Sequence, residues 1–220
     1  MNQRVLCGGF VSDPPPQAYF LTHVMSEPAF DVLRTKEQLG YIVHTSTKVS
    51  ENILAIQFII QGDSTSPGHI DSRIEAFLDT FRKMLADMPE KTFNNHVTAC
   101  VEKLLETDKS LNEVTGRVHA QINNGRYVFD RGRQEAAVIK ELHARDALRY
   151  FDRKLASEGR ERKKFSCWCV GKEWRGEREN EDGVEKKEGV VVMREGEQGD
   201  FKNHMALWPL NETVDFERFA

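Results

Sequence analysis

The sequence lacks any long hydrophobic run. Its most apolar stretch, residues 53–60, is interrupted by Gln57 and is far shorter than the roughly 20 residues that cross a membrane. The N-terminal residues carry a single charge and no apolar segment of signal-peptide length. The sequence therefore predicts a protein that neither spans a membrane nor enters the secretory pathway, and we expect a cytoplasmic location.

Cysteine is scarce, and neither sign of charge dominates. Four cysteines in 220 residues are too few for a disulfide framework, and Cys167 and Cys169 are separated by a single residue. In a strand that spacing puts the two about 6.5 Å apart, whereas the Cβ atoms of a disulfide lie ~3.8 Å apart. We therefore expect reduced thiols. The 31 basic and 35 acidic residues give a net charge of −4, which argues against nucleic acid and anionic membranes as partners.

Motifs for metal binding or nucleophilic chemistry are also missing. The sequence contains no His-x-x-Glu-His motif, no Cys-x-x-Cys pair, no Gly-x-Ser-x-Gly elbow and no phosphate-binding glycine loop. His96 and Cys100 have the i, i+4 spacing of one helix face, but a zinc ion needs two further ligands, for which the sequence offers no candidates. We expect no metal site and no catalytic residue in this chain alone.

The apolar residues that are present alternate between helical and strand periods. We expect an irregular lead-in over residues 1–16, because Gly8-Gly9 and Pro14-Pro15-Pro16 disfavour both a helix and a central strand. An α+β domain is expected over 17–170. Its predicted elements are two helical pieces over 18–39 that meet at Pro28, strands at 41–45 and 53–60, helices that begin near Ser66, Pro89 and Ser110, helices at about 131–142 and 145–156, and a strand at 164–170.

The helix after Ser66 has the clearest pattern. Ser66 and Pro67 form an N-cap and first-turn proline, and an apolar stripe follows. The stripe consists of Ile70, Ile74, Phe77, Leu78, Phe81 and Leu85. The helix after Ser110 has a capping box and a stripe of its own, formed by Leu111, Val114, Val118 and Ile122. This order of elements predicts a mixed or antiparallel sheet with the helices clustered on one face.

The C-terminal fifth of the chain differs in composition. About half of residues 171–200 are charged, so we expect a disordered charged insertion there. Residues 201–220 begin with a new apolar stretch and are expected to form a docking segment on the domain.

One segment carries a family signature. Residues 27–43, and above all Leu33-Arg-Thr-Lys-Glu-Gln-Leu-Gly-Tyr41, closely resemble the C-terminal half of insulinase-type zinc metallopeptidases, the pitrilysin and insulin-degrading enzyme family. The similarity continues through residues 58–61, 72–77, 127–131 and 207–210. Members of this family have four homologous LuxS-like α+β domains in two halves that close around a peptide, and this chain resembles the fourth domain.

The resemblance implies a role in substrate binding. In the family, an Arg and a Tyr of the signature reach the substrate near the zinc ion, and they correspond to Arg34 and Tyr41 of this sequence. The implied partners are peptide substrates and a catalytic N-terminal half, in cis or in trans. Zinc is expected in that catalytic half, with none bound by this chain. A guanidinium and a phenol are both donors that can hold a substrate carbonyl or a developing oxyanion.

The residues leave other interpretations open. Arg34 is equally compatible with a surface or capping ion pair, and Tyr41 with a strand residue packed on the helices. The chain as a whole is compatible with a stand-alone module that binds peptides or forms a homo-oligomer, and with a degraded gene product that has no folded role. The stretch before Gln17 does not match the family, where a further strand begins this domain, so we expect an open edge beside the strand at 53–60.

Overall fold

The computed structural model describes residues 5–9, 11–12, 16–50, 53–63, 65–123, 125 and 127–169. The chain divides into two compact units, Met1–Trp174 and Arg175–Ala220, and all of the described residues belong to the first. The predicted insertion at 171–200 and docking segment at 201–220 lie outside the described residues. None of the helices in the described ranges combines the length and hydropathy that crossing a bilayer requires.

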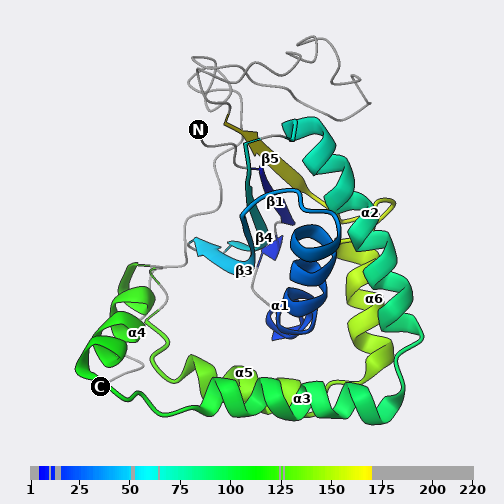
Figure 1. The fold of residues 1–220 in the computed structure, drawn as a ribbon. Helices are drawn as coiled ribbons and strands as arrows, with labels where there is room; N and C mark the ends of the chain where they lie inside the picture. The colour runs from blue at the N-terminus through cyan, green and yellow to red at the C-terminus, as the bar shows by residue number, and fades with distance from the viewer. Residues whose placement is uncertain are drawn as a thin grey trace. The chain divides into compact units, whose positions relative to one another are not determined.

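An antiparallel sheet lies at the centre of the first unit. Strand β4 (Ile53–Gln61) has β3 (Ile42–Ser50) on one side, with β1 (Val5–Gly9) and β2 (Val11–Ser12) on the other. Strand β5 (Lys164–Trp168) pairs with β1. The described strands thus form a five-stranded sheet in which each recorded pairing is antiparallel (Figure 1). The prediction of a strand in the middle of a sheet is therefore confirmed for β4.

The N-terminal residues correct two predictions. Residues 5–9 form β1, which lies between β4 and β5, and residues 11–12 form β2. The irregular lead-in predicted over 1–16 is therefore wrong at these described residues, and so is the open edge beside 53–60. The error came from treating Gly8 and Gly9 as strand breakers. They lie at the end of β1 opposite Phe165 and Lys164, where backbone pairing needs no side chain. Because β1 pairs with β4, this strand has no open edge there to support the self-association that the sequence suggested.

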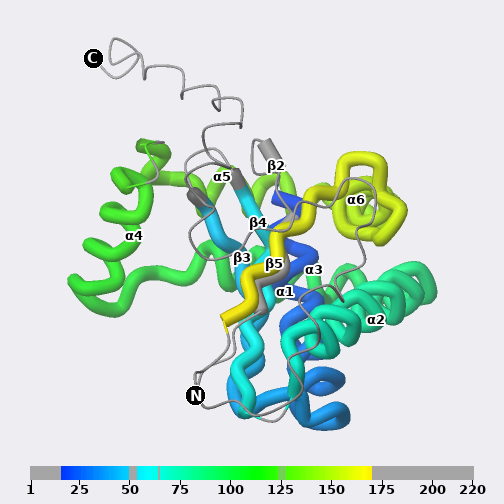
Figure 2. Tube along the Cα trace, turned by 90° about the horizontal axis from the view of Figure 1, so that it is seen from above, coloured from blue at the N-terminus to red at the C-terminus, as the bar shows by residue number. Residues whose placement is uncertain are grey.

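The helices other than α4 gather on one side of the sheet, as predicted (Figures 1 and 2). Helix α1 (Pro16–Ala29) packs on β3 and β4 and continues directly into a π-helix, η1 (Phe30–Lys36), so the change of helix type falls just after Pro28. The other helices are α2 (Pro67–Ala86), α3 (Glu90–Leu105), α4 (Leu111–Asn123), α5 (Arg131–Lys140) and α6 (Ala144–Lys154). α2 packs against α6, and α3 packs against α5.

Helix α2 joins the sheet to α6 through the predicted stripe. The Ser66 side chain accepts a hydrogen bond from the backbone N–H of His69 at 3.3 Å, which confirms the N-cap. The stripe is buried at Ile70, Ile74, Phe77, Leu78, Phe81 and Leu85. The rings of Phe58 on β4 and Phe77 are 6.1 Å apart, and those of Phe81 and Phe151 on α6 are 5.8 Å apart. The core is thus continuous from the sheet to α6.

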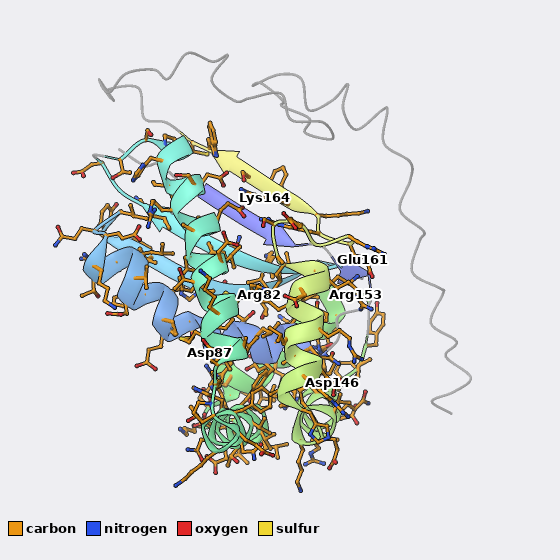
Figure 3. All side chains as sticks on the ribbon, turned by 90° about the vertical axis from the view of Figure 1, so that its right-hand side faces the viewer. Arg82, Asp87, Asp146, Arg153, Glu161 and Lys164 are labelled. Carbon is orange, nitrogen blue, oxygen red and sulfur yellow. The ribbon has the colours of Figure 1, made fainter. Side chains whose placement is uncertain are left out.

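Ion pairs fasten the outer elements to α2. Lys164 on β5 pairs with Asp71 of α2 at 2.6 Å, and Arg82 of α2 pairs with Asp152 of α6 at 2.6 Å. Figure 3 labels Lys164 and Arg82 at these two junctions. The edge strand β5 is therefore held both by its pairing with β1 and by a charged contact with α2.

Helix α4 is capped as predicted but not buried. The backbone N–H of Glu113 donates to Ser110 Oγ at 3.2 Å, as a capping box requires. Leu111 and Ile122, the two ends of its apolar stripe, are 79% and 44% exposed. In Figure 1, α4 lies apart from the sheet, at the end of the layer formed by α3 and α5. Periodicity predicted the helix, but it carries no information on which surface covers the stripe.

Candidate functional site

Arg34 lies on the π-helix that follows α1. Pro28, in the last turn of α1, has no N–H to donate, and its ring crowds the preceding turn. The chain then widens into η1, a helix type that is rare and is frequently found at functional sites. Leu33 is fully buried, whereas Arg34 is only partly buried. The π-helix is thus anchored in the core immediately beside Arg34.

A tight turn leads from η1 to β3. The backbone N–H of Glu37 donates to the carbonyl of Val32 at 2.9 Å, and that of Leu39 donates to the carbonyl of Leu33 at 3.1 Å. Between them, Gln38 has a φ of 51°, in the left-handed region that residues with a Cβ rarely adopt. Leu39 is only 4% exposed. Hydrogen bonds and a buried side chain therefore fix the path of this turn.

Two glycines allow the turn to lie directly against the end of β4. A Cβ on Gly40 would be 2.4 Å from the backbone oxygen of Gln61, and a Cβ on Gly62 would be 2.7 Å from that of Leu39. Only glycine fits two backbones at such an approach. The approach lets the backbone N–H of Tyr41 donate to the Gln61 carbonyl at 3.0 Å. The end of β4 therefore sets the position of Tyr41.

The structure brings Arg34 and Tyr41 together. Arg34 Nε donates to the backbone oxygen of Tyr41 at 3.3 Å. No carboxylate in the described part of the chain forms an ion pair with Arg34. Tyr41 is 56% exposed, so it is not packed on the helices. Among the described residues, Arg34 therefore does not form the ion pair that the sequence also allowed. Tyr41 is likewise not the packed strand residue that was the other interpretation.

Gln61 is a third member of this group, and it was not predicted. Its Nε2 donates to the Oη of Tyr41 at 2.5 Å, and the residue is only 7% exposed. The available signal was a polar residue at the end of a mostly apolar strand, but sequence alone does not reveal its partner. Arg34, Tyr41 and Gln61 form a cluster in which a guanidinium and a phenol, both hydrogen-bond donors, lie at the surface above a buried amide.

An ion pair ties the turn to α2. Arg73 Nε donates to Glu37 Oε2 at 2.8 Å, and Arg73 Nη2 donates to Glu37 Oε1 at 2.6 Å, a bidentate arrangement. The hydrogen bonding from Arg73 lowers the pKa of Glu37 below its ordinary value and outweighs burial, which acts in the opposite direction. The charges of Arg73 and His69 add to the lowering. The carboxylate form of Glu37 is therefore the one that holds the turn.

This ion pair predicts a pH-dependent stability. Because the pKa of Glu37 is lower in the folded chain than in the unfolded one, its stabilisation is complete above about pH 4.5 and is lost as the pH falls through the folded-state value. Glu37→Gln should lower the melting temperature at pH 7, and the deficit should shrink as the pH approaches 3. Thermal unfolding followed by circular dichroism measures both. The exposed Glu158→Gln is the control, and an equal Glu37→Gln deficit at both pH values would contradict the assignment.

The described residues do not fit a zinc ion. No three His, Cys, Asp or Glu side chains in the described ranges are grouped as a metal site requires. Cys100, the partner of His96 in the i, i+4 pair on α3, is fully buried. Burial raises the pKa of its thiol to about 11, whereas a metal ligand must be a thiolate. Cys100 therefore packs in the core, whereas His96 is only partly buried.

The sequence that forms this site is similar to sequences of known proteins. A family model described as "PQQ synthase PqqF-like, C-terminal lobe domain 4" matches residues 20–119, which include the whole cluster. Human insulin-degrading enzyme is 36% identical over 150 residues, which cover 68% of this chain and 15% of the relative. Putative zinc protease mug138 of Schizosaccharomyces pombe is 29% identical over 199 residues, or 89% of this chain and 20% of the relative. The chain thus spans no more than a fifth of either relative.

Solved structures share the fold. The crystal structure of pitrilysin matches with a TM-score of 0.61 at 21% identity, covering 74% of this chain and 18% of that chain. The inactive peptidase domain of a putative zinc protease from Bordetella parapertussis matches with a TM-score of 0.55 at 12% identity, covering 77% and 94% of the two chains. These matches confirm the predicted α+β fold, with its helices on one face of an antiparallel sheet.

Proposed function

This chain belongs to the insulinase- and pitrilysin-type family of zinc metallopeptidases, and we propose that it is the substrate-binding, non-catalytic C-terminal portion of such an endopeptidase. One observation carries the proposal. Arg34 lies on η1, and Tyr41 lies on the turn that is fixed to the end of β4. Together they present a guanidinium without a carboxylate partner among the described residues next to a half-exposed phenol.

The chemistry of the two side chains suits a peptide backbone. The Nε of Arg34 donates to the Tyr41 carbonyl, so the two terminal nitrogens of the guanidinium can donate to a ligand. A peptide bond offers a carbonyl acceptor at every residue, so this recognition does not depend on the side chains of the substrate. In the assembled enzyme the same donors stabilise negative charge that develops on the carbonyl oxygen during hydrolysis.

The proposal also includes a catalytic half, in the same polypeptide or another one. Its zinc ion would lower the pKa of a bound water far below that of bulk water, to roughly 7. Because the described residues hold no such site, the chain alone is expected not to hydrolyse peptides. The closed chamber around the peptide belongs to the same proposal, and the much greater length of the human relative supports it. A cytoplasmic location is also part of the proposal.

A nuclear magnetic resonance titration of the 220-residue chain with an unstructured peptide tests the contact directly. We expect amide shifts concentrated in η1, the turn at 37–41 and the end of β4. Arg34→Ala should weaken the peptide affinity by roughly tenfold, because a hydrogen bond from a charged group contributes about 1.5 kcal/mol or more.

The matched control is Arg145→Ala, which removes an arginine of α6 whose side chain is 78% exposed. It should bind as tightly as the unaltered chain. Shifts spread over other surfaces, or equal affinities of the two variants, would contradict the proposal. Binding through Arg34 by a chain that adds nothing to any catalytic half would instead favour the stand-alone peptide-binding alternative.

A further inference from the structure

Gln61 holds Tyr41 at two points. Its backbone carbonyl accepts the N–H of Tyr41 at 3.0 Å, and its side-chain Nε2 donates to the phenol Oη at 2.5 Å. The residue is only 7% exposed, whereas Tyr41 is 56% exposed. A buried amide at the end of β4 thus reaches outward to a side chain at the surface.

This arrangement sets the direction of the phenol hydrogen. A phenol oxygen has one hydrogen to donate and lone pairs that accept. Because Nε2 of Gln61 donates into the oxygen, the O–H of Tyr41 points elsewhere and stays available as a donor. A hydroxyl that accepts one hydrogen bond is also polarised, which strengthens the bond that it donates.

The conformational entropy lost by fixing the Tyr41 side chain indicates a function for the fixed conformation. An exposed tyrosine ordinarily samples several rotamers, and fixing it costs conformational entropy that the isolated domain does not recover. Here the backbone N–H, the backbone carbonyl and the phenol of Tyr41 are all engaged, by Gln61, Arg34 and Gln61 respectively. Such pre-organisation increases affinity when a ligand arrives, because less freedom remains to be lost.

We propose that Gln61 is a positioning residue that orients the Tyr41 hydroxyl as a hydrogen-bond donor toward a carbonyl oxygen of a bound peptide. This inference rests on the proposed substrate-binding role of Tyr41. It adds a residue buried in the end of β4 to the two surface residues. It also assigns the phenol one direction of hydrogen bonding, in which the oxygen accepts from the protein and donates to the substrate.

A double-mutant cycle in the full 220-residue chain tests the inference. Gln61→Met keeps the length of the side chain but removes the N–H, and Gln61→Glu offers an acceptor that draws the phenol hydrogen inward. Each should weaken peptide affinity about fivefold, measured by the same titration. In a Tyr41→Phe background both should change affinity less than twofold, because no hydroxyl remains to orient.

The outcomes separate the inference from the proposed function. If Tyr41→Phe alone binds peptide like the unaltered chain, the proposed role of Tyr41 fails, and the inference fails with it. If Tyr41→Phe weakens binding but the Gln61 variants do not, or weaken it equally in both backgrounds, only the inference is overturned. An equal loss in both backgrounds would assign Gln61 to general stability of the β4 end.

A second measurement needs no change at position 61. In Tyr41→Phe the side-chain amide proton of Gln61 that is donated to the Tyr41 Oη should shift upfield, since this acceptor is gone. The side-chain amide of Gln134, which donates to Asp130 Oδ1 at 2.9 Å on another part of the domain, is the internal control and should not move. Unchanged Gln61 amide resonances would overturn the inference whether or not the Gln61 variants fold.

Discussion

Gly40→Ala is expected to destabilise the domain by about 3 kcal/mol, the upper range for adding a methyl group to a closely packed site. The added Cβ would lie 2.4 Å from the backbone oxygen of Gln61 and 3.1 Å from the backbone nitrogen of Gly62. Both atoms belong to the main chain, so no side-chain rotation relieves the overlap. The turn must move away from β4, and the hydrogen bond from the Tyr41 N–H to the Gln61 carbonyl is stretched or lost.

Thermal unfolding measures this effect, and a loss of that size corresponds to a melting temperature lower by roughly 6 to 12 °C. Gly116→Ala is a matched control, because a Cβ on Gly116, within α4, meets nothing within 4 Å. There alanine should be neutral or stabilise by up to about 1 kcal/mol, through its higher helix propensity. Equal melting temperatures of the two variants would show that the turn does not need the close approach.

Gly40→Ala should also affect the site formed by Arg34, Tyr41 and Gln61. Because Tyr41 follows Gly40 directly, displacement of the turn moves the phenol relative to Arg34 and Gln61. Peptide affinity of Gly40→Ala should therefore fall even at temperatures where the chain stays folded. The glycines at 40 and 62 thus contribute to the proposed function without contacting a ligand.

Local patterns were sufficient to predict most of the helical layer. The stripe from Ile70 to Leu85 and the Ser66 cap are encoded within one segment of 20 residues, and the structure has both. The position of β1 was not predictable in this way, because it depends on pairing with residues some 50 and 160 positions away in sequence. Glycines that break an isolated strand are tolerated at the end of β1, where pairing with β5 supplies the backbone hydrogen bonds.

The residues of the site also differ in whether local sequence identifies them. Arg34 and Tyr41 were identified through their resemblance to a family signature, which is a local sequence feature. Gln61 is 20 positions from Tyr41, and only the three-dimensional contact between β4 and the turn reveals that its amide meets the phenol. The exposed stripe of α4 is a further example, since an amphipathic pattern does not identify the surface that covers it.

Loss of either of the two proposed substrate-binding side chains should have its largest effect during catalysis. Arg34→Ala and Tyr41→Phe are each expected to lower kcat/KM by roughly 10² to 10³ in an assembled enzyme, the cost of removing one donor from an oxyanion site. The effect exceeds the expected tenfold loss in peptide binding because the donors act more strongly on the negative charge of the transition state than on a neutral carbonyl.

A chimera provides the assembled enzyme. The 150 matching residues of human insulin-degrading enzyme are exchanged for those of this chain, which are 36% identical. The activity that the relative's name states, degradation of insulin, is the readout. Arg145→Ala in the same chimera controls for the loss of an arginine elsewhere on the domain.

The rate of insulin degradation by this chimera, with and without Arg34→Ala and Tyr41→Phe, is the most direct measurement of the central claim. The account predicts an active chimera, a loss of roughly 10² to 10³ for each of the two substitutions, and no loss for Arg145→Ala. Activity of the Arg34 and Tyr41 variants within twofold of the parent chimera would contradict the claim that these residues hold the substrate.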